Sequence, residues 1–263
     1  MHRSLTIGGV LLAVTALAAF AFLRHREARD QAARHHWNAA IRATFDPSRD
    51  LGWIETFETT RTMPLAEYDP RWQPLFGRLL VDRRLSAVIG DPEGGWQLDG
   101  GDDYAFRALD VPVGSVEMTV DGWWDGHGSI GAQIAVQRTP PHQLYEAALW
   151  RGRIALIHFI GPTPDRYEVL AESVDSTPLA AGFYRLQVCA ELNASVWRLR
   201  AVLRDPLSGY RIIRQVSASD GRLPEGFQGI GLLGSGGPRA SYVTGIVVRS
   251  PQEPLWCSAT ATP

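Results

Sequence analysis

Short runs of apolar residues recur about every 10 to 15 residues between residues 96 and 249, with Gly, Pro, Asp or Asn between them. Within these runs apolar and polar residues alternate, as where Val116, Met118 and Val120 are separated by single polar residues. A period of two places the two kinds of side chain on opposite faces of a strand. Evenly spaced runs of this kind are typical of an antiparallel sandwich. We therefore predict an all-β fold in which each such strand has one solvent-facing side.

The composition fits this prediction, with 26 Gly, 17 Pro and 45% hydrophobic residues, as expected of many short strands joined by turns. About 220 residues follow the N-terminal segment, and this length is more typical of one domain than of two. We predict a β-sandwich domain over residues 46–250 and a C-terminal tail over 251–263. A net charge of −2 provides no field that would attract nucleic acid.

The N-terminal segment contains an uncharged apolar run from Ser4 to Leu23, long enough as a helix to cross a bilayer core of ~30 Å. It predicts a transmembrane anchor over residues 1–23. A helical pattern continues as a juxtamembrane helix over residues 24–45, until Asp46 and Pro47 end it. The alternative is a cleaved signal peptide, because residues 19–21 resemble a cleavage site.

The orientation of this predicted single-pass protein has two opposing indications. Four arginines follow the apolar run closely and only Arg3 precedes it, which favours a cytoplasmic C-terminal domain. Single N-terminal anchors, however, commonly deliver a β-domain across the membrane. We expect the second arrangement, with the sandwich outside the cytoplasm, in the periplasm or the extracellular space.

The order of the runs also carries a family resemblance. The pattern comprises YEAAL at 145–149, PLAAGFYRLQV at 178–188, WRLRAVLRD at 197–205, PEGFQGIGL at 224–232 and YVTGIVV at 242–248. It resembles concanavalin A-like lectin/glucanase domains, including the laminin G-like and keto-disaccharide hydrolase-like branches, over about residues 50 to 250. The resemblance implies a two-sheet antiparallel jelly-roll sandwich with a concave face. It indicates a fold, and a fold does not determine a function.

The glucanases of the superfamily that this sequence resembles carry alternating acidic residues on one strand. Here only Glu117 and Asp121 share a strand face, and Thr119 occupies the position between them. An extended strand separates two such carboxylates by about 13 Å, whereas hydrolysis of a glycosidic bond needs about 5 to 9.5 Å. We therefore predict no catalytic residues, and the sequence features together favour a protein that is not an enzyme.

Aromatic residues mark the candidate ligand site. Trp123 and Trp124 are adjacent, so they should point to opposite faces, one toward the core and the other available to stack on a sugar ring. A core role alone is the alternative. Trp150, with Arg151 and Arg153, would add an aromatic platform and guanidinium donors for hydroxyl or carboxylate groups. The predicted ligand-binding residues are Trp123, Trp124, Asp125, Trp150 and Arg151.

The same turn offers two carboxylates, Asp121 and Asp125, that could supply oxygens to calcium, although two acids in a Gly-rich stretch also simply form the turn. No other cofactor is predicted, because the histidines lack zinc-ligand spacing.

The two cysteines predict a disulfide. Cys189 alternates with the apolar residues of its run, so its thiol should lie opposite the core and need a cover. The tail that carries Cys257 could supply that cover, which predicts a Cys189–Cys257 bond in an oxidising compartment. A free buried Cys189 beside a disordered tail is the alternative.

Together these features predict a membrane-tethered module that binds a glycan or an envelope protein and no nucleic acid. Two alternatives stay open: a carbohydrate-active hydrolase of the glucanase or keto-disaccharide hydrolase type, and a structural component of an envelope assembly.

Overall fold

The computed structural model describes residues 15, 17–22, 24–25, 53–91, 102–137, 143–160, 166–174, 177–222, 227–235 and 241–249. The chain divides into two compact units, residues 1–44 and 45–263. Within the described residues no helix is both long and apolar enough for a membrane span. Most of the predicted anchor at 1–23 and of the juxtamembrane helix at 24–45 lies outside those residues, as does the whole tail at 251–263.

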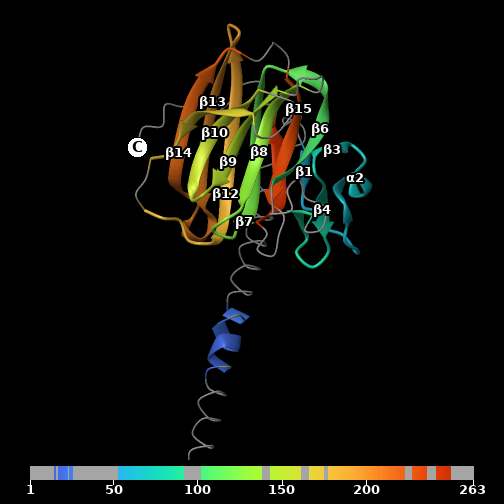
Figure 1. Cartoon of the computed structure of the whole chain (residues 1–263), viewed down its shortest axis with the longest axis vertical. Helices are drawn as coiled ribbons and strands as arrows, with labels where there is room; N and C mark the ends of the chain where they lie inside the picture. The colour runs from blue at the N-terminus through green and yellow to red at the C-terminus, as the bar shows by residue number, and fades with distance from the viewer. Residues whose placement is uncertain are drawn as a thin grey trace, which may run out of the picture. The chain divides into compact units, whose positions relative to one another are not determined.

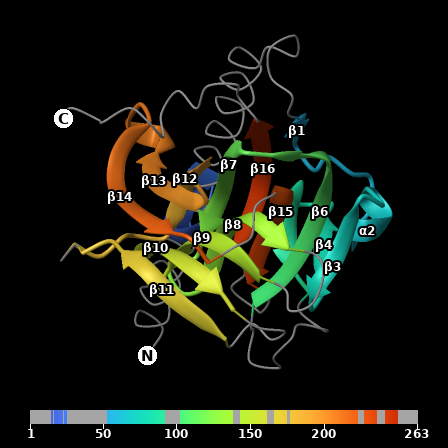
Figure 2. The same ribbon diagram turned by 90° about the horizontal axis from the view of Figure 1, so that it is seen from above.

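The second unit is a sandwich of two antiparallel sheets (Figures 1 and 2). Over the described residues the larger sheet has nine strands, in the order β14 (Arg211–Asp220), β13 (Val196–Asp205), β12 (Gly182–Asn193), β7 (Ser115–Trp124), β16 (Tyr242–Arg249), β5 (Ala87–Gly90), β4 (Leu79–Asp82) and β2 (Met63–Pro64), with β1 (Trp53–Glu55) paired to β16. The smaller sheet has seven, in the order β11 (Tyr167–Glu172), β10 (Arg153–Phe159), β9 (Gln143–Trp150), β8 (Ser129–Gln137), β15 (Phe227–Ser235), β6 (Asp102–Val113) and β3 (Trp72–Phe76).

The all-β sandwich is thus confirmed, and the period of two correctly identifies the core. Val116, Met118 and Val120 of β7 and Leu186 and Val188 of β12 all face the space between the sheets, where they join one buried cluster. Two short helical segments, α2 (Leu65–Tyr68) and η1 (Pro206–Ser208), complete the described elements of this unit. In the first unit, residues 15, 17–22 and 24–25 are helical.

Before residue 96 the sequence pattern predicts an irregular stretch around Pro74 and one strand over residues 79–89, and the structure corrects both predictions. Residues 79–89 form β4 and β5 with a turn between them. Asp82 ends β4 because its Oδ1 accepts hydrogen bonds from the backbone N–H groups of Arg84 and Leu85, which holds the chain in a turn. The stretch around Pro74, expected to be irregular, is the edge strand β3, the position in a sheet that tolerates proline.

The prediction that one side of β7 and one side of β12 face solvent also needs correction. Thr119, Asp121 and Cys189 point away from the core, yet all three are buried. Asp121 is buried because Arg185 and Tyr210 cover it. Alternation therefore correctly separates the two faces of these strands, but it does not tell which face is open to water.

Candidate functional site

The outer face of the smaller sheet carries an apolar cluster that is separate from the core. In β9, Tyr145 and Leu149 join the core, while the alternate residues Ala148 and Trp150 join this second cluster. The same alternation in β10 directs Phe159 outward. Most residues of this second cluster are buried, and Trp150 is partly exposed.

A pocket opens within this cluster, and we call it the sheet-face pocket. It has a volume of about 120 Å³ and is lined by Tyr104, Ser129, Glu146, Ala148, Trp150, Ile157, Phe159 and Tyr167. The ring of Phe159 lies between Tyr104 and Tyr167, with centroid distances of 5.8 and 6.0 Å. Tyr167 is 43% exposed, so part of this aromatic wall is accessible from solvent.

The sheet-face pocket also contains a buried acidic group. Glu146 is 2% exposed, and its Oε2 accepts a hydrogen bond of 3.0 Å from Nε2 of the buried Gln133. Gly231 on β15 leaves room for this pair, because a Cβ at position 231 would stand 2.2 Å from Gln133 Oε1. The pocket therefore combines aromatic rings with a buried carboxylate.

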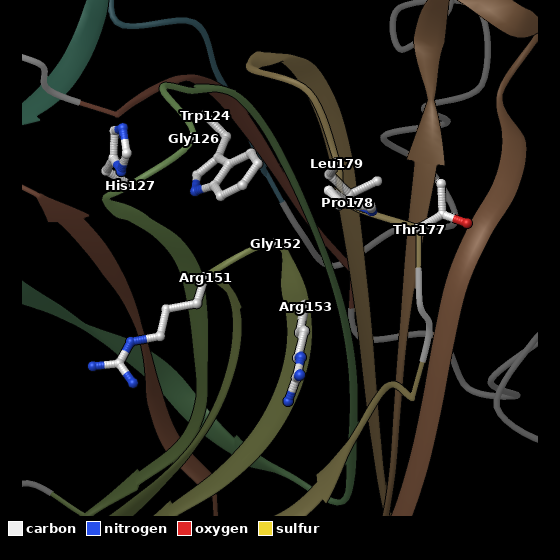
Figure 3. Close-up of a pocket in the computed structure, with 9 residues that line it drawn as sticks. All are labelled: Trp124, Gly126, His127, Arg151, Gly152, Arg153, Thr177, Pro178 and Leu179. Carbon is white, nitrogen blue, oxygen red and sulfur yellow. The ribbon is translucent and has the colours of Figure 1, made fainter.

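A second and larger hollow, the end pocket, has a volume of about 650 Å³ and lies beside the β9–β10 hairpin. It is lined by Trp124, Gly126, His127, Arg151, Gly152, Arg153, Thr177, Pro178 and Leu179. Figure 3 shows Trp124 and His127 on one side of Gly152, with the side chains of Arg151 and Arg153 extending on the other. Both pockets therefore draw on the same hairpin, since Trp150 lines one and Arg151 lines the other.

The hairpin turn fixes the position of these arginines. Trp150 pairs with Arg153, and the two residues between them have φ of 50° at Arg151 and 74° at Gly152. Two consecutive positive φ values are the mark of a type I′ turn. The Arg151 guanidinium lies 4.3 Å from the centroid of the Trp150 ring, a cation–π contact.

The predicted ligand-binding residues divide among three places. Trp124 and Arg151 line the end pocket, and Trp150 lines the sheet-face pocket. Trp123 lies apart from both, packed against Phe183 and Tyr242 with centroid distances of 5.3 and 6.5 Å. The two tryptophans do point to opposite faces, with Trp124 in the core cluster, but Trp123 is only 9% exposed.

Asp125 has a local role in its turn. Its Oδ1 accepts hydrogen bonds from the backbone N–H groups of His127 and Gly128 and from Ser241 Oγ. Asp121 instead accepts two hydrogen bonds from Arg185. Both carboxylates considered for calcium therefore have protein partners, and the described part of the chain contains no group of three or more His, Cys, Asp or Glu suited to a metal ion.

The burial of Asp121 predicts a pH dependence of stability. Removal from water raises the pKa of this carboxyl from 3.8 to about 6, and Arg185 only partly opposes the rise. The folded chain therefore holds this proton at a higher pH than the unfolded chain does. We expect the contribution of Asp121 to the free energy of unfolding to fall as pH rises from about 4 to about 6 and then to level off. Urea titrations across this range should show the fall in the wild type and a flatter curve in Asp121→Asn.

Cys189 is fully buried and disulfide-bonded, and no free cysteine occurs among the described residues. Cys257 lies outside those residues, so the predicted Cys189–Cys257 pairing stays a prediction.

Several pocket residues were not predicted from the sequence, namely Tyr104, Glu146, Phe159, Tyr167 and His127. Glu146 had a usable signal, because it occupies an outward position in a strand whose other outward residues are apolar. The grouping of Tyr104 with Tyr167 had no such signal. They come from β6 and β11, which are separated in the smaller sheet by β10, β9, β8 and β15.

No known protein-family model matches the chain, and no curated protein sequence matches it. Among solved structures it is similar to lectin II from Ulex europaeus, with a TM-score of 0.48 and 10% identity over 76% of this chain and 98% of that one. It is also similar to the VIP36 exoplasmic/lumenal domain in its Ca²⁺/Man3GlcNAc-bound form, with a TM-score of 0.47 and 11% identity over 76% and 92%. Peanut lectin gives a TM-score of 0.46 and 9% identity over 75% and 96%. At these TM-scores and identities the similarities assign neither a family nor a ligand to the chain.

Proposed function

We propose that the β-sandwich is a carbohydrate-binding module whose sheet-face pocket receives the ring of a sugar. The observation that carries the proposal is the combination in one pocket of exposed aromatic surface at Tyr167 with the buried carboxylate of Glu146. A sugar presents apolar C–H faces and polar hydroxyl edges. Aromatic rings suit the faces, and a carboxylate accepts hydrogen bonds from hydroxyl groups.

The size of the pocket supports recognition of one ring of a longer chain. Its 120 Å³ lie below the range of about 300 to 1,000 Å³ typical of pockets that enclose a whole small molecule. A ring inserted by one edge would contact the aromatic wall and leave its neighbours in the chain outside. This geometry suits an oligosaccharide better than a compact apolar ligand.

Binding without catalysis is the form we favour. Glu146 is the one carboxylate among the lining residues of the sheet-face pocket, whereas glycoside hydrolysis commonly uses two that flank the bond. Tethering by residues 1–23 and placement of the sandwich outside the cytoplasm stay predictions of the sequence.

A glycan array probed with the purified full chain tests the proposal, followed by calorimetry with the best oligosaccharide. Tyr167→Ala should weaken binding at least about tenfold, because it removes an exposed ring of the wall. Ile212→Ala, which shortens an equally exposed apolar residue on β14, should leave the affinity unchanged.

Glu146→Gln distinguishes the roles of the carboxylate. Weaker binding with no sugar released by either protein supports a binding module. Release of reducing sugar by the wild type, abolished by Glu146→Gln, would instead establish the hydrolase. An array with no bound glycan would contradict both.

A further inference from the structure

The end pocket offers positive charge without an acidic residue in its lining. Arg151, Arg153 and His127 contribute to the lining, and none of its other residues is Asp or Glu. Arginine keeps its charge at any pH a folded protein meets. A hollow with this lining therefore favours a ligand group of negative charge.

The two arginines remain available to such a group. Arg153 Nη1 lies 3.3 Å from Glu172 Oε2, but the two side chains are 55% and 35% exposed, and exposed pairs of this kind are weak. Among the described residues, Arg151 contacts the Trp150 ring and no carboxylate. Both guanidinium groups can therefore donate hydrogen bonds to an acidic ligand group with little loss of existing interactions.

The backbone conformation of Arg151 also supports a functional role for this residue. A type I′ turn favours Asn or Gly at its first central position, because positive φ strains other residues. This chain has Arg with φ of 50° at that position, followed by Gly152. Backbone strain at the rim of a pocket often marks a functional position.

The remaining walls suit a sugar ring. Pro178 and Leu179 provide apolar surface on the side of Gly152 away from Arg151 (Figure 3). A volume of about 650 Å³ lies within the range of small-molecule sites. Trp150 of the sheet-face pocket directly precedes Arg151 of the end pocket, so the two pockets lie near each other along this hairpin.

We propose that the end pocket binds the acidic group of an anionic saccharide, a carboxylate or a sulfate, held by Arg151 and Arg153. This inference rests on the proposed carbohydrate-binding function and specifies the class of ligand. Arg151 supplies a rigidly placed fork of donors, Arg153 supplies a second, and the apolar wall contacts the ring.

The test compares three probes on the full chain by calorimetry: a glucuronate-containing oligosaccharide, the same compound with its carboxylates reduced to alcohols, and a sulfated derivative of the reduced compound. The wild type should bind at least one anionic probe about tenfold or more tightly than the reduced one. The relative affinities of the carboxylated and sulfated probes identify the acidic group.

The variant Arg151→Asn separates binding from folding. It should lose about tenfold in affinity for the anionic probe and keep its affinity for the reduced probe. Its melting temperature should stay equal or rise, because Asn-Gly is the favoured sequence for this turn. The matched control is Arg198→Gln, which removes the same charge from an exposed position on β13 and should bind like the wild type.

Four other results would contradict the inference, and each has a different meaning. Equal binding of all probes, unchanged in Arg151→Asn, would overturn it and leave the carbohydrate-binding function standing. An equal loss in Arg198→Gln would show general charge attraction instead of a site. Binding only to phosphatidylserine vesicles would assign the arginines to a membrane surface. Binding to no saccharide on the array would remove the proposed function as well.

Discussion

Replacement of Asp121 by alanine should lower the free energy of unfolding at pH 7 by about 3 to 5 kcal/mol, the usual cost of breaking a buried ion pair on one side. Asp121 accepts hydrogen bonds of 2.9 and 3.0 Å from Nε and Nη2 of Arg185. The two side chains are only 6% and 11% exposed, and Tyr210 covers the guanidinium at 4.0 Å from its ring centroid. Without Asp121, the charge of Arg185 would stay buried and unpaired. Urea unfolding of the full chain measures the loss.

Two further variants test this explanation. Glu172→Ala removes the carboxylate of the exposed pair with Arg153 and should cost less than about 1 kcal/mol. The double variant Asp121→Leu with Arg185→Met replaces both charges by apolar groups and should be more stable than Asp121→Ala alone. A double variant as unstable as the single one would show that lost packing, and not the unpaired arginine, explains the effect.

Replacement of Cys257 by serine should lower the free energy of unfolding by about 4 kcal/mol, because the predicted bond to Cys189 closes a loop of about 68 residues in the unfolded chain. Cys189 lies on β12, fully buried on the side opposite the core. Serine at 257 removes the bond and leaves that buried position unchanged. Urea unfolding without reductant should show the difference.

Reduction provides the control for this prediction. Dithiothreitol should bring the wild type down to the stability of Cys257→Ser and should leave the variant unaffected. Peptide mapping without reductant should recover residues 189 and 257 in one linked pair. Two free thiols in protein purified without reductant would contradict the bridge and would weaken the expectation of an oxidising compartment.

The fold could be predicted largely from the sequence because its strands are regular. The runs 129–137 and 153–159 coincide with β8 and β10, since turn residues delimit both. The prediction failed where a local contact decided the structure. The turn between β4 and β5 depends on hydrogen bonds from Asp82, and the run of apolar residues around it hides the break.

The candidate site could be predicted only in part. Trp150, Arg151 and Arg153 were recognisable because they lie together in one hairpin. The rings of Tyr104 and Phe159 have centroids 5.8 Å apart although β9, β8 and β15 lie between their strands in the smaller sheet, and no local pattern of the sequence reveals this contact. Trp123 was predicted to bind a ligand, but Phe183 and Tyr242 from other strands pack against it and leave it almost no exposed surface.

The position of a bound oligosaccharide tests the central claim most directly. A crystal structure of the chain with the best ligand from the array should place a sugar ring in the sheet-face pocket, against the rings of Tyr167 and Phe159 and with a hydroxyl within hydrogen-bond distance of Glu146. A sugar found only elsewhere on the sandwich, with the sheet-face pocket unoccupied, would contradict the account.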